Sequence, residues 1–349
     1  SPLPRAPSAG SKADRAMPAA PVPKVTAAPP AAPAAGTGPL RKVPPPVLLG
    51  AGILSVQIGA GIAARMFGTV SAAGLTGLRL WAATLVLAGL AARPTIRAVR
   101  GVIADRAWRD AAVVVAFGVT LGVMNFSIYQ AFARIPLGIA VTIEFLGPLA
   151  VAIASSRRLI DLVWVVLAGT GVTLLGTAGA SVARLGAEVT GTAGHVAHSS
   201  AELAGVIFAL VAAAAWAAYI LLSASTGRRF SGSSGLVIAM AVASLIVTPP
   251  AVASAGSALL TPAVLGAGLA IGLLSSVIPY RFELETLRRV PARVFGIWMS
   301  LEPAVAALVG VVMLSQALSL PQWLAIGCVT IASAGAALGA GRSATAPQA

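Results

Sequence analysis

The chain has 349 residues, of which 58% are hydrophobic and only 10% are charged, and its formal net charge at pH 7 is +14. Roughly a quarter of the residues of a soluble protein are charged, so this composition excludes an ordinary soluble enzyme. The positive charge is divided among short segments between apolar runs. That distribution orients membrane proteins, and it argues against a nucleic-acid partner.

The chain begins with a polar segment, residues 1–46, which is rich in Pro and Ala and carries scattered Lys and Arg. Such a segment cannot bury a core, so we expect a disordered cytoplasmic tail. Contact of this basic tail with anionic lipid is the functional alternative.

Apolar runs of about 20 residues then follow one another, which predicts about ten transmembrane helices. The predicted spans are Val47–Ala64, Ala72–Ala91, Ala111–Ala131, Leu137–Ala154, Leu162–Ala180, Leu203–Ser223, Gly235–Ala253, Ala263–Phe282, Val294–Leu314 and Gln322–Gly339. Pro249-Pro250 could end the seventh span early.

The loops between these spans differ in positive charge. With the N-terminus inside, the inner segments carry 20 of the 24 Lys and Arg residues, and the outer segments carry only Arg65, Arg134 and Arg184. Positive charge is retained on the cytoplasmic side of membrane proteins. The sequence therefore predicts a multi-pass protein of the cell (plasma or inner) membrane with both termini in the cytoplasm.

The two halves of the chain share a pattern. Three residue pairs are separated by the same 155 positions: Arg134 and Arg289, Pro136 and Pro291, and Pro148 and Pro303. Five spans per half is an odd number, so the halves must cross the membrane in opposite directions. We therefore expect an all-α polytopic membrane protein built from two inverted five-helix repeats. The first repeat would cover 47–180 and the second 203–340, with an extracytoplasmic loop at 181–202 and a short cytoplasmic tail at 341–349.

Three ionisable residues fall well inside the spans: Arg79, Glu144 and Glu302. A charge at the bilayer centre costs roughly 2.5–3.5 kcal/mol, so such residues face a cavity or a partner. Under one hypothesis they line a substrate cavity, where Arg79 holds a carboxylate and Glu144 receives an ammonium group or a coupling proton. Under the other, Arg79 and Glu144 form a structural ion pair. Glu302 either joins the cavity or braces the adjacent break.

Gly147, Pro148 and Pro303 are the predicted helix breaks, because proline removes a backbone donor and clashes with the preceding turn. Carbonyls freed near mid-membrane can bind a ligand or cation, although a neighbouring helix can equally satisfy them. Asn125, Gln57 and Tyr280 are further cavity candidates, or they tie helices together by hydrogen bonds. Under the 155-residue offset the prolines are equivalent and the acids are not, because Glu144 matches Met299.

Nothing in the sequence favours an enzyme. It contains no phosphate-binding GxxxxGK[ST] motif, no GxSxG motif and no convergent Ser-His-Asp set. His195 and His198 share a polar loop without a third ligand, and the one cysteine, Cys328, lies in an apolar run as a packing residue. We expect no cofactor and no metal ion.

The chain resembles the ten-helix EamA branch of the drug/metabolite transporter superfamily, and within it the threonine/homoserine exporters. The resemblance covers nearly everything after the tail. It rests on Ser55–Ala63, Gly74–Leu80, Pro136–Ala168, Ala212–Ser223, Val277–Gly310 and Gln322–Ser333, of which EFLGPLAVA followed by SSRR is the most specific part. It implies five-plus-five inverted repeats, a central cavity and export of small metabolites, typically amino acids, coupled to the proton gradient. One departure is Ser315-Gln316, where such sequences often carry Gly-Glu.

The sequence and the resemblance together predict a secondary transporter that exports a small amino acid, such as threonine or homoserine, by alternating access. A drug or polyamine cation effluxer of the same fold is the first alternative. A non-transporting membrane scaffold or sensor is the second, and it would have a dry interior with Arg79 and Glu144 fully paired.

Overall fold

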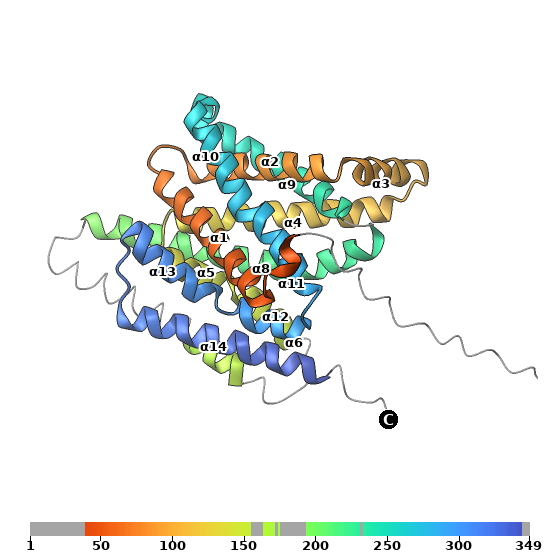
Figure 1. Cartoon of the computed structure of the whole chain (residues 1–349). Helices are drawn as coiled ribbons and strands as arrows, with labels where there is room; N and C mark the ends of the chain where they lie inside the picture. The colour runs from red at the N-terminus through yellow and green to blue at the C-terminus, as the bar shows by residue number, and fades with distance from the viewer. Residues whose placement is uncertain (1–38, 155–162, 172–173, 175–192, 231–232, 344–349) are drawn as a thin grey trace, which may run out of the picture. The chain divides into compact units, whose positions relative to one another are not determined.

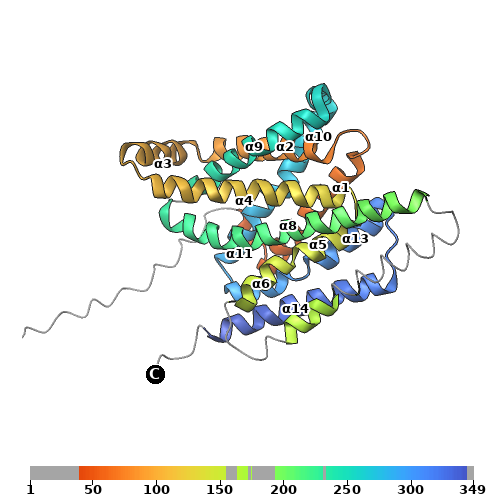
Figure 2. The same ribbon diagram turned by 180° about the vertical axis from the view of Figure 1, so that it is seen from behind.

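The computed structural model describes residues 39–154, 163–171, 174, 193–230 and 233–343. This part of the chain consists of helices and their connections, without strands (Figures 1 and 2). Nine of its helical segments are long and apolar enough to cross a membrane. The prediction of an all-α polytopic membrane protein is thus confirmed. The predicted span Leu162–Ala180 lies partly outside the described residues, and its described portion, 163–171, is helical.

The helices of the first half follow a short 3-10 turn, η1 (Pro39–Lys42). They are α1 (Pro45–Met66), α2 (Ala72–Leu90), α3 (Ala92–Ala104), α4 (Trp108–Phe132), α5 (Leu137–Glu144) and α6 (Leu146–Ala154). Those of the second half are α8 (Ala193–Arg229), α9 (Ser234–Ala255), η2 (Gly256–Leu260), α10 (Pro262–Gly272), η3 (Leu273–Val277), α11 (Ile278–Leu287), α12 (Ala292–Met299), α13 (Glu302–Leu314) and α14 (Leu320–Ser343).

Several boundaries differ from the predicted ones. The last residues of the predicted tail are helical, because η1 and the start of α1 lie within 39–46. Arg289 holds this segment by donating hydrogen bonds to the carbonyl oxygens of Leu40 (2.8 Å) and Val43 (2.9 Å). The described part of the predicted 181–202 loop is also helical, since α8 begins at Ala193. The predictions for residues 1–38 and 175–192 fall outside the described residues.

Two further differences concern segments with unusual residues. The predicted loop at 92–110 contains α3, a helix without a buried residue, which carries three arginines and the exposed side chains of Ile96, Val99 and Ile103. The possibility that Pro249-Pro250 ends the seventh span early is wrong, because α9 continues through both prolines to Ala255. Membrane helices tolerate proline where other groups satisfy the freed carbonyls.

Two spans are broken in the middle, and proline explains where. Pro148 has no N–H group to bond the carbonyl of the residue four positions earlier, which is Glu144, and α5 ends at Glu144. Pro303 has the same effect on Met299, where α12 ends. Both half-helices begin directly after a proline, Pro136 or Pro291. The two breaks are therefore 155 residues apart, as the spacing of the prolines requires.

The contacts between helices also recur in the two halves. Helix α4 of the first half packs on α8, and the corresponding helix of the second half, α11, packs on α1. In the same way α5 and α6 contact α8, whereas α12 and α13 contact α1. Helices α1 and α8 run in opposite directions, and so do α2 and α9, which lie side by side (Figures 1 and 2). The broken spans thus meet near the middle of the bundle, where α5 packs against α13.

Glycine permits two close approaches at the broken spans. A Cβ atom at Gly138 of α5 would lie 2.6 Å from Cα of Ala307 in α13, closer than real Cβ atoms come to backbone. A Cβ atom at Gly147 of α6 would clash with the carbonyl oxygen of Ala213 in α8. These contacts fix the half-helices so that Glu144 and Glu302 both reach the centre of the bundle.

The connection after α13 explains the departure at Ser315-Gln316. Ser315 has φ 53°, in the left-handed region that favours glycine. The side-chain oxygen of Gln316 accepts a hydrogen bond from the backbone N–H of Leu137 (3.0 Å), an otherwise unpaired donor at the start of α5. The segment therefore connects the end of α13 to the start of α5.

We expect Ser315→Gly to stabilise the protein by about 0.5–1 kcal/mol, because it relieves a left-handed conformation at some cost in unfolded-state entropy. Thermal unfolding of the detergent-solubilised protein would show this as a higher midpoint. Ser319→Gly is the matched control in the same connection, where the residue has no positive φ. A midpoint for Ser315→Gly at or below that of the control would contradict the prediction.

Candidate functional site

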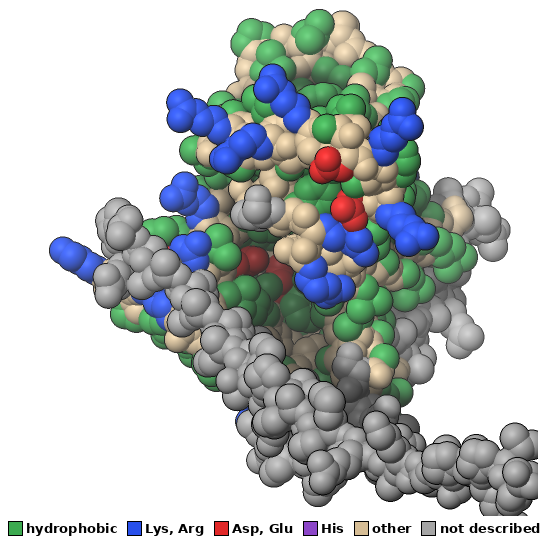
Figure 3. Space-filling view, turned by 90° about the vertical axis from the view of Figure 1, so that its right-hand side faces the viewer, with side chains coloured by type: hydrophobic (Ala, Val, Ile, Leu, Met, Phe, Trp, Pro, Cys, Tyr) green, Lys and Arg blue, Asp and Glu red, His purple; other side chains and the backbone are tan. Residues whose placement is uncertain are grey.

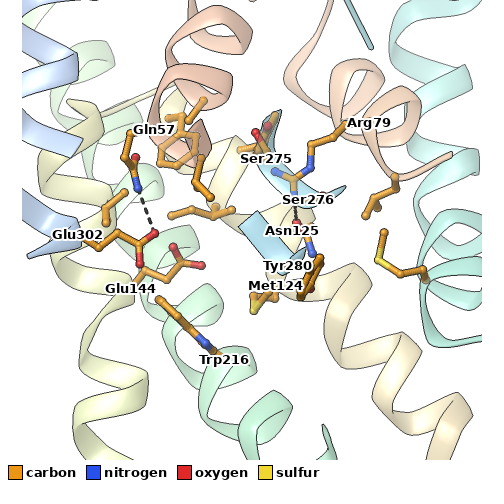
Figure 4. A pocket seen from close by; sticks show the side chains of 18 residues that line it. Gln57, Arg79, Met124, Asn125, Glu144, Trp216, Ser275, Ser276, Tyr280 and Glu302 are labelled. Atoms are coloured by element: carbon orange, nitrogen blue, oxygen red, sulfur yellow. Dashed lines mark hydrogen bonds between the residues drawn. The ribbon is translucent and has the colours of Figure 1, made fainter. Parts of the chain in front are cut away.

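A cavity of about 140 Å³ lies at the centre of the bundle (Figure 4). All six side chains predicted as substrate-binding candidates line it: Gln57, Arg79, Asn125, Glu144, Tyr280 and Glu302. They come from α1, α2, α4, α5, α11 and α13, and so from both halves of the chain. The tertiary structure thus gathers the polar groups of the spans at one place, while their role in binding stays a prediction.

Arg79 forms one flank of the cavity. Its guanidinium donates a hydrogen bond to Oδ1 of Asn125 and lies 4.8 Å from the ring centroid of Tyr129, a cation–π contact. Asn125 is itself oriented by donating from Nδ2 to the carbonyl oxygen of Leu121 (2.8 Å). Nε of Arg79 is buried without a hydrogen-bond partner among the described residues. The arrangement holds the guanidinium rigidly and leaves donor capacity for a ligand.

Glu302 and Gln57 form part of the opposite flank. Nε2 of Gln57 donates to Oε1 of Glu302 at 3.1 Å, and the two residues are only 1% and 8% exposed. Oε2 of Glu302 and Oε1 of Gln57 have no partner within the described part of the chain. Buried acceptors without partners are rare in native structures, so these oxygens are positioned to receive donors from a bound molecule.

Glu144 lies beside Glu302 on the same flank, across the cavity from Arg79 and Asn125 (Figure 4). It is the last residue of α5, directly before the break, and it is half-buried. No hydrogen bond or ion pair of its carboxylate occurs among the described residues. The cavity therefore has a guanidinium on one flank and two carboxylates on the other.

The hypothesis of a structural Arg79–Glu144 ion pair does not fit this geometry. The ion pairs in the described ranges join Arg229 to Asp110 and Arg288 and Arg289 to Glu285, none of them at the cavity. The two flanks are not packed against each other, because a cavity with polar side chains separates them.

Other lining residues were not among the predicted candidates. Tyr129 is 1% exposed and stacks on Arg79, one helical turn after Asn125 on the same face of α4. That spacing was a usable signal. Ser275 and Ser276 belong to η3, a π-helix that the sequence did not predict, and the indole of Trp216 also reaches the cavity. Short π-helical segments are frequent at functional sites.

The predicted breaks lie beside this cavity and do not line it. Pro148 borders a neighbouring cavity that is mainly apolar, whereas Gly147 and Pro303 are buried in helix contacts. No group of three potential metal ligands occurs in the described part of the chain. The side chains of His195 and His198 lie outside the described residues.

Apolar helices long enough to cross a membrane, two of them broken beside a central polar cavity, are the arrangement of membrane transporters. Residues 203–338 match the EamA-like transporter family. The threonine/homoserine exporter RhtA of Escherichia coli (strain K12) is 39% identical over 304 residues, which cover 86% of this chain and 95% of that protein. RhtA of Salmonella typhimurium (strain LT2) is 36% identical over 304 residues, which again cover 86% of this chain and 95% of that protein.

The chain therefore belongs to the EamA-like transporters of the drug/metabolite transporter superfamily. These relatives are exporters and not enzymes. The uncharacterized transporter YwfM of Bacillus subtilis (strain 168) is 30% identical over 130 residues, 37% of this chain and 44% of that protein. One crystal structure matches with a TM-score of 0.51 at 17% identity over 85% of this chain and 98% of the other, which is a likeness of fold alone.

Proposed function

We propose that the protein is a secondary active transporter that exports small amino acids, such as threonine or homoserine. The observation that carries the proposal is the charge arrangement of the central cavity, with Arg79 on one flank and Glu144 and Glu302 on the other. An α-amino acid carries a carboxylate and an ammonium group, which match the two flanks. The names of the RhtA relatives support the same substrate class.

The mechanism that we propose is alternating access. The helix contacts that recur between the halves, and the half-helices that break 155 residues apart, support two repeats that rock around a central site. We further propose coupling to the proton gradient through Glu144, because its carboxylate borders the cavity and can carry a proton between states. The distribution of Lys and Arg supports insertion in the cell membrane with both termini in the cytoplasm.

The proposal is tested by uptake of labelled threonine and homoserine into inside-out vesicles that contain the protein. Accumulation above vesicles without the protein, abolished by a proton ionophore, is the expected result. A panel with polyamines, aromatic cations and carboxylic acids identifies the competing cargoes. Transport of the cations alone would favour a drug or polyamine effluxer, and no transport of any compound would overturn the proposal in favour of a scaffold or sensor.

A further inference from the structure

Two further cavities adjoin the central one. The second, of about 150 Å³, shares Trp216, Tyr280 and Glu302 with the central cavity. The third, of about 320 Å³, is lined mainly by hydrophobic side chains and shares Trp216, Tyr219 and Glu283 with the second. The three cavities are therefore consecutive, and Glu283 lies where the second meets the third.

Glu283 was not recognised as a candidate from the sequence, because it lies near the charged connection after the eighth span. It is half-buried on α11, and its carboxylate has no hydrogen-bond or ion-pair partner in the described part of the chain. Two residues further along the same helix, Glu285 is bound by Arg289 and by Arg288 at 3.5 Å. The contrast indicates that Glu285 is structural, whereas the carboxylate of Glu283 is available to a ligand.

The surroundings of Glu283 suit a cationic group. Tyr219 and Tyr280 line the second cavity together with Glu283, and Trp216 lines all three cavities. Aromatic faces beside a carboxylate favour a partly desolvated ammonium group. Oε2 of Glu302, an unpartnered atom of a side chain that is only 8% exposed, borders the same second cavity from the other side.

The end of the molecule where α3 lies is hollowed (Figure 3). Figure 3 looks onto the end where α3 lies and shows acidic side chains recessed in a hollow, with hydrophobic side chains around them and Lys and Arg near its margin. By the charge distribution of the loops, this end is the predicted cytoplasmic one. Glu283 lies three residues beyond Tyr280 on α11, toward the connection before α12 that carries Arg288 and Arg289, so a substrate that enters from this side would pass it before the central cavity.

We propose that Glu283 forms a second binding station for the ammonium group of the substrate, between the cytoplasmic face and the central cavity. The substrate of this station rests on the proposed function, to which the station adds a binding step before the central cavity. An ammonium group that leaves water needs a partner at each stage, because an unpaired charge in a low-dielectric interior is costly. Glu283 supplies that partner before Glu302 and Glu144 do.

Inside-out vesicles expose the cytoplasmic face, so they measure the KM of this approach. We expect Glu283→Gln to raise the KM for threonine about tenfold, since one charge-assisted hydrogen bond is lost, with a maximal rate within about twofold of wild type. Glu285→Gln is the matched control on the same helix and should leave KM unchanged. Glu283→Ala removes the same charge without introducing an amide, and it serves if the glutamine variant does not fold.

Propylamine, which has an ammonium group and no carboxylate, gives a readout that does not depend on transport. It should raise the thermal unfolding midpoint of the purified full chain in wild type and Glu285→Gln, and much less in the Glu283 variants. Unchanged KM and unchanged propylamine protection in the Glu283 variants would overturn the station while threonine transport still supported the proposed function. Protection that depends on Glu283 in a protein that transports no amino acid would support the station and refute the proposed function.

Discussion

Replacing Arg79 with Gln should lower kcat/KM for threonine by at least about 100-fold, because the substrate carboxylate loses a charge-assisted, fork-like partner in a buried site. The glutamine side chain is two bonds shorter than the arginine and does not replace the hydrogen bond to Oδ1 of Asn125, so the thermal unfolding midpoint of the variant is measured beside its transport. Arg79→Lys should be almost as impaired, because an ammonium group lacks the planar fork. Initial rates of threonine uptake into inside-out vesicles measure both variants.

A specific readout separates this role from a general defect. The amino alcohol analogue of threonine has no carboxylate, so wild type should take it up far less well than threonine, and Arg79→Gln should lose the preference. Arg229→Gln is the control, since the 2.6 Å ion pair of Arg229 with Asp110 is substantially exposed and distant from the cavity. Loss of this ion pair should lower the free energy of unfolding by only about 0–1 kcal/mol. An Arg79→Gln protein that still prefers threonine to the alcohol would refute carboxylate binding at Arg79.

Glu144→Gln should abolish gradient-driven accumulation, because an amide of nearly the same shape cannot carry a proton. Accumulation by this variant should match wild-type vesicles treated with an ionophore, while exchange of labelled for unlabelled threonine persists. Glu302→Gln should cause a smaller loss, since Oε1 of Glu302 already accepts a hydrogen bond from Gln57. Both assays use the same vesicle preparations.

The control for the acidic residues is Glu202→Gln, which changes an exposed carboxylate near the start of α8. It should transport like wild type. Equal gradient-driven transport by wild type and Glu144→Gln would exclude the proposed role of Glu144. If Glu302→Gln were the more impaired variant in accumulation, the coupling role would belong to Glu302 instead.

Much of the fold followed from local sequence. Proline removes one particular hydrogen bond, so Pro148 and Pro303 determined that α5 ends at Glu144 and α12 at Met299. The extra helix α3 was missed because its arginine-rich sequence resembles an ordinary cytoplasmic loop. The π-helix η3 was missed because nothing in its apolar run distinguishes it from an α-helix.

The candidate site was predicted from the free-energy cost of placing a charge inside the membrane, and not from a sequence motif. Arg79 and Glu144 could be chosen because a charged side chain inside a span must face a cavity or a partner, and that argument applies to one residue at a time. The same argument could not find Tyr129 or Trp216, since aromatic residues are unremarkable in apolar helices. It also missed Glu283, because its depth in the membrane depends on the course of α11.

The sequence by itself determined that the chain is an all-α membrane protein with broken spans and rare intramembrane charges, because hydropathy, charge and proline act locally along the chain. Only the tertiary structure decided which side chains meet. The rotation of each helix is set by contacts such as Gly138 against Ala307 and Gly147 against Ala213. These contacts between distant segments place two carboxylates opposite one guanidinium, and they leave a third carboxylate, Glu283, along a series of cavities.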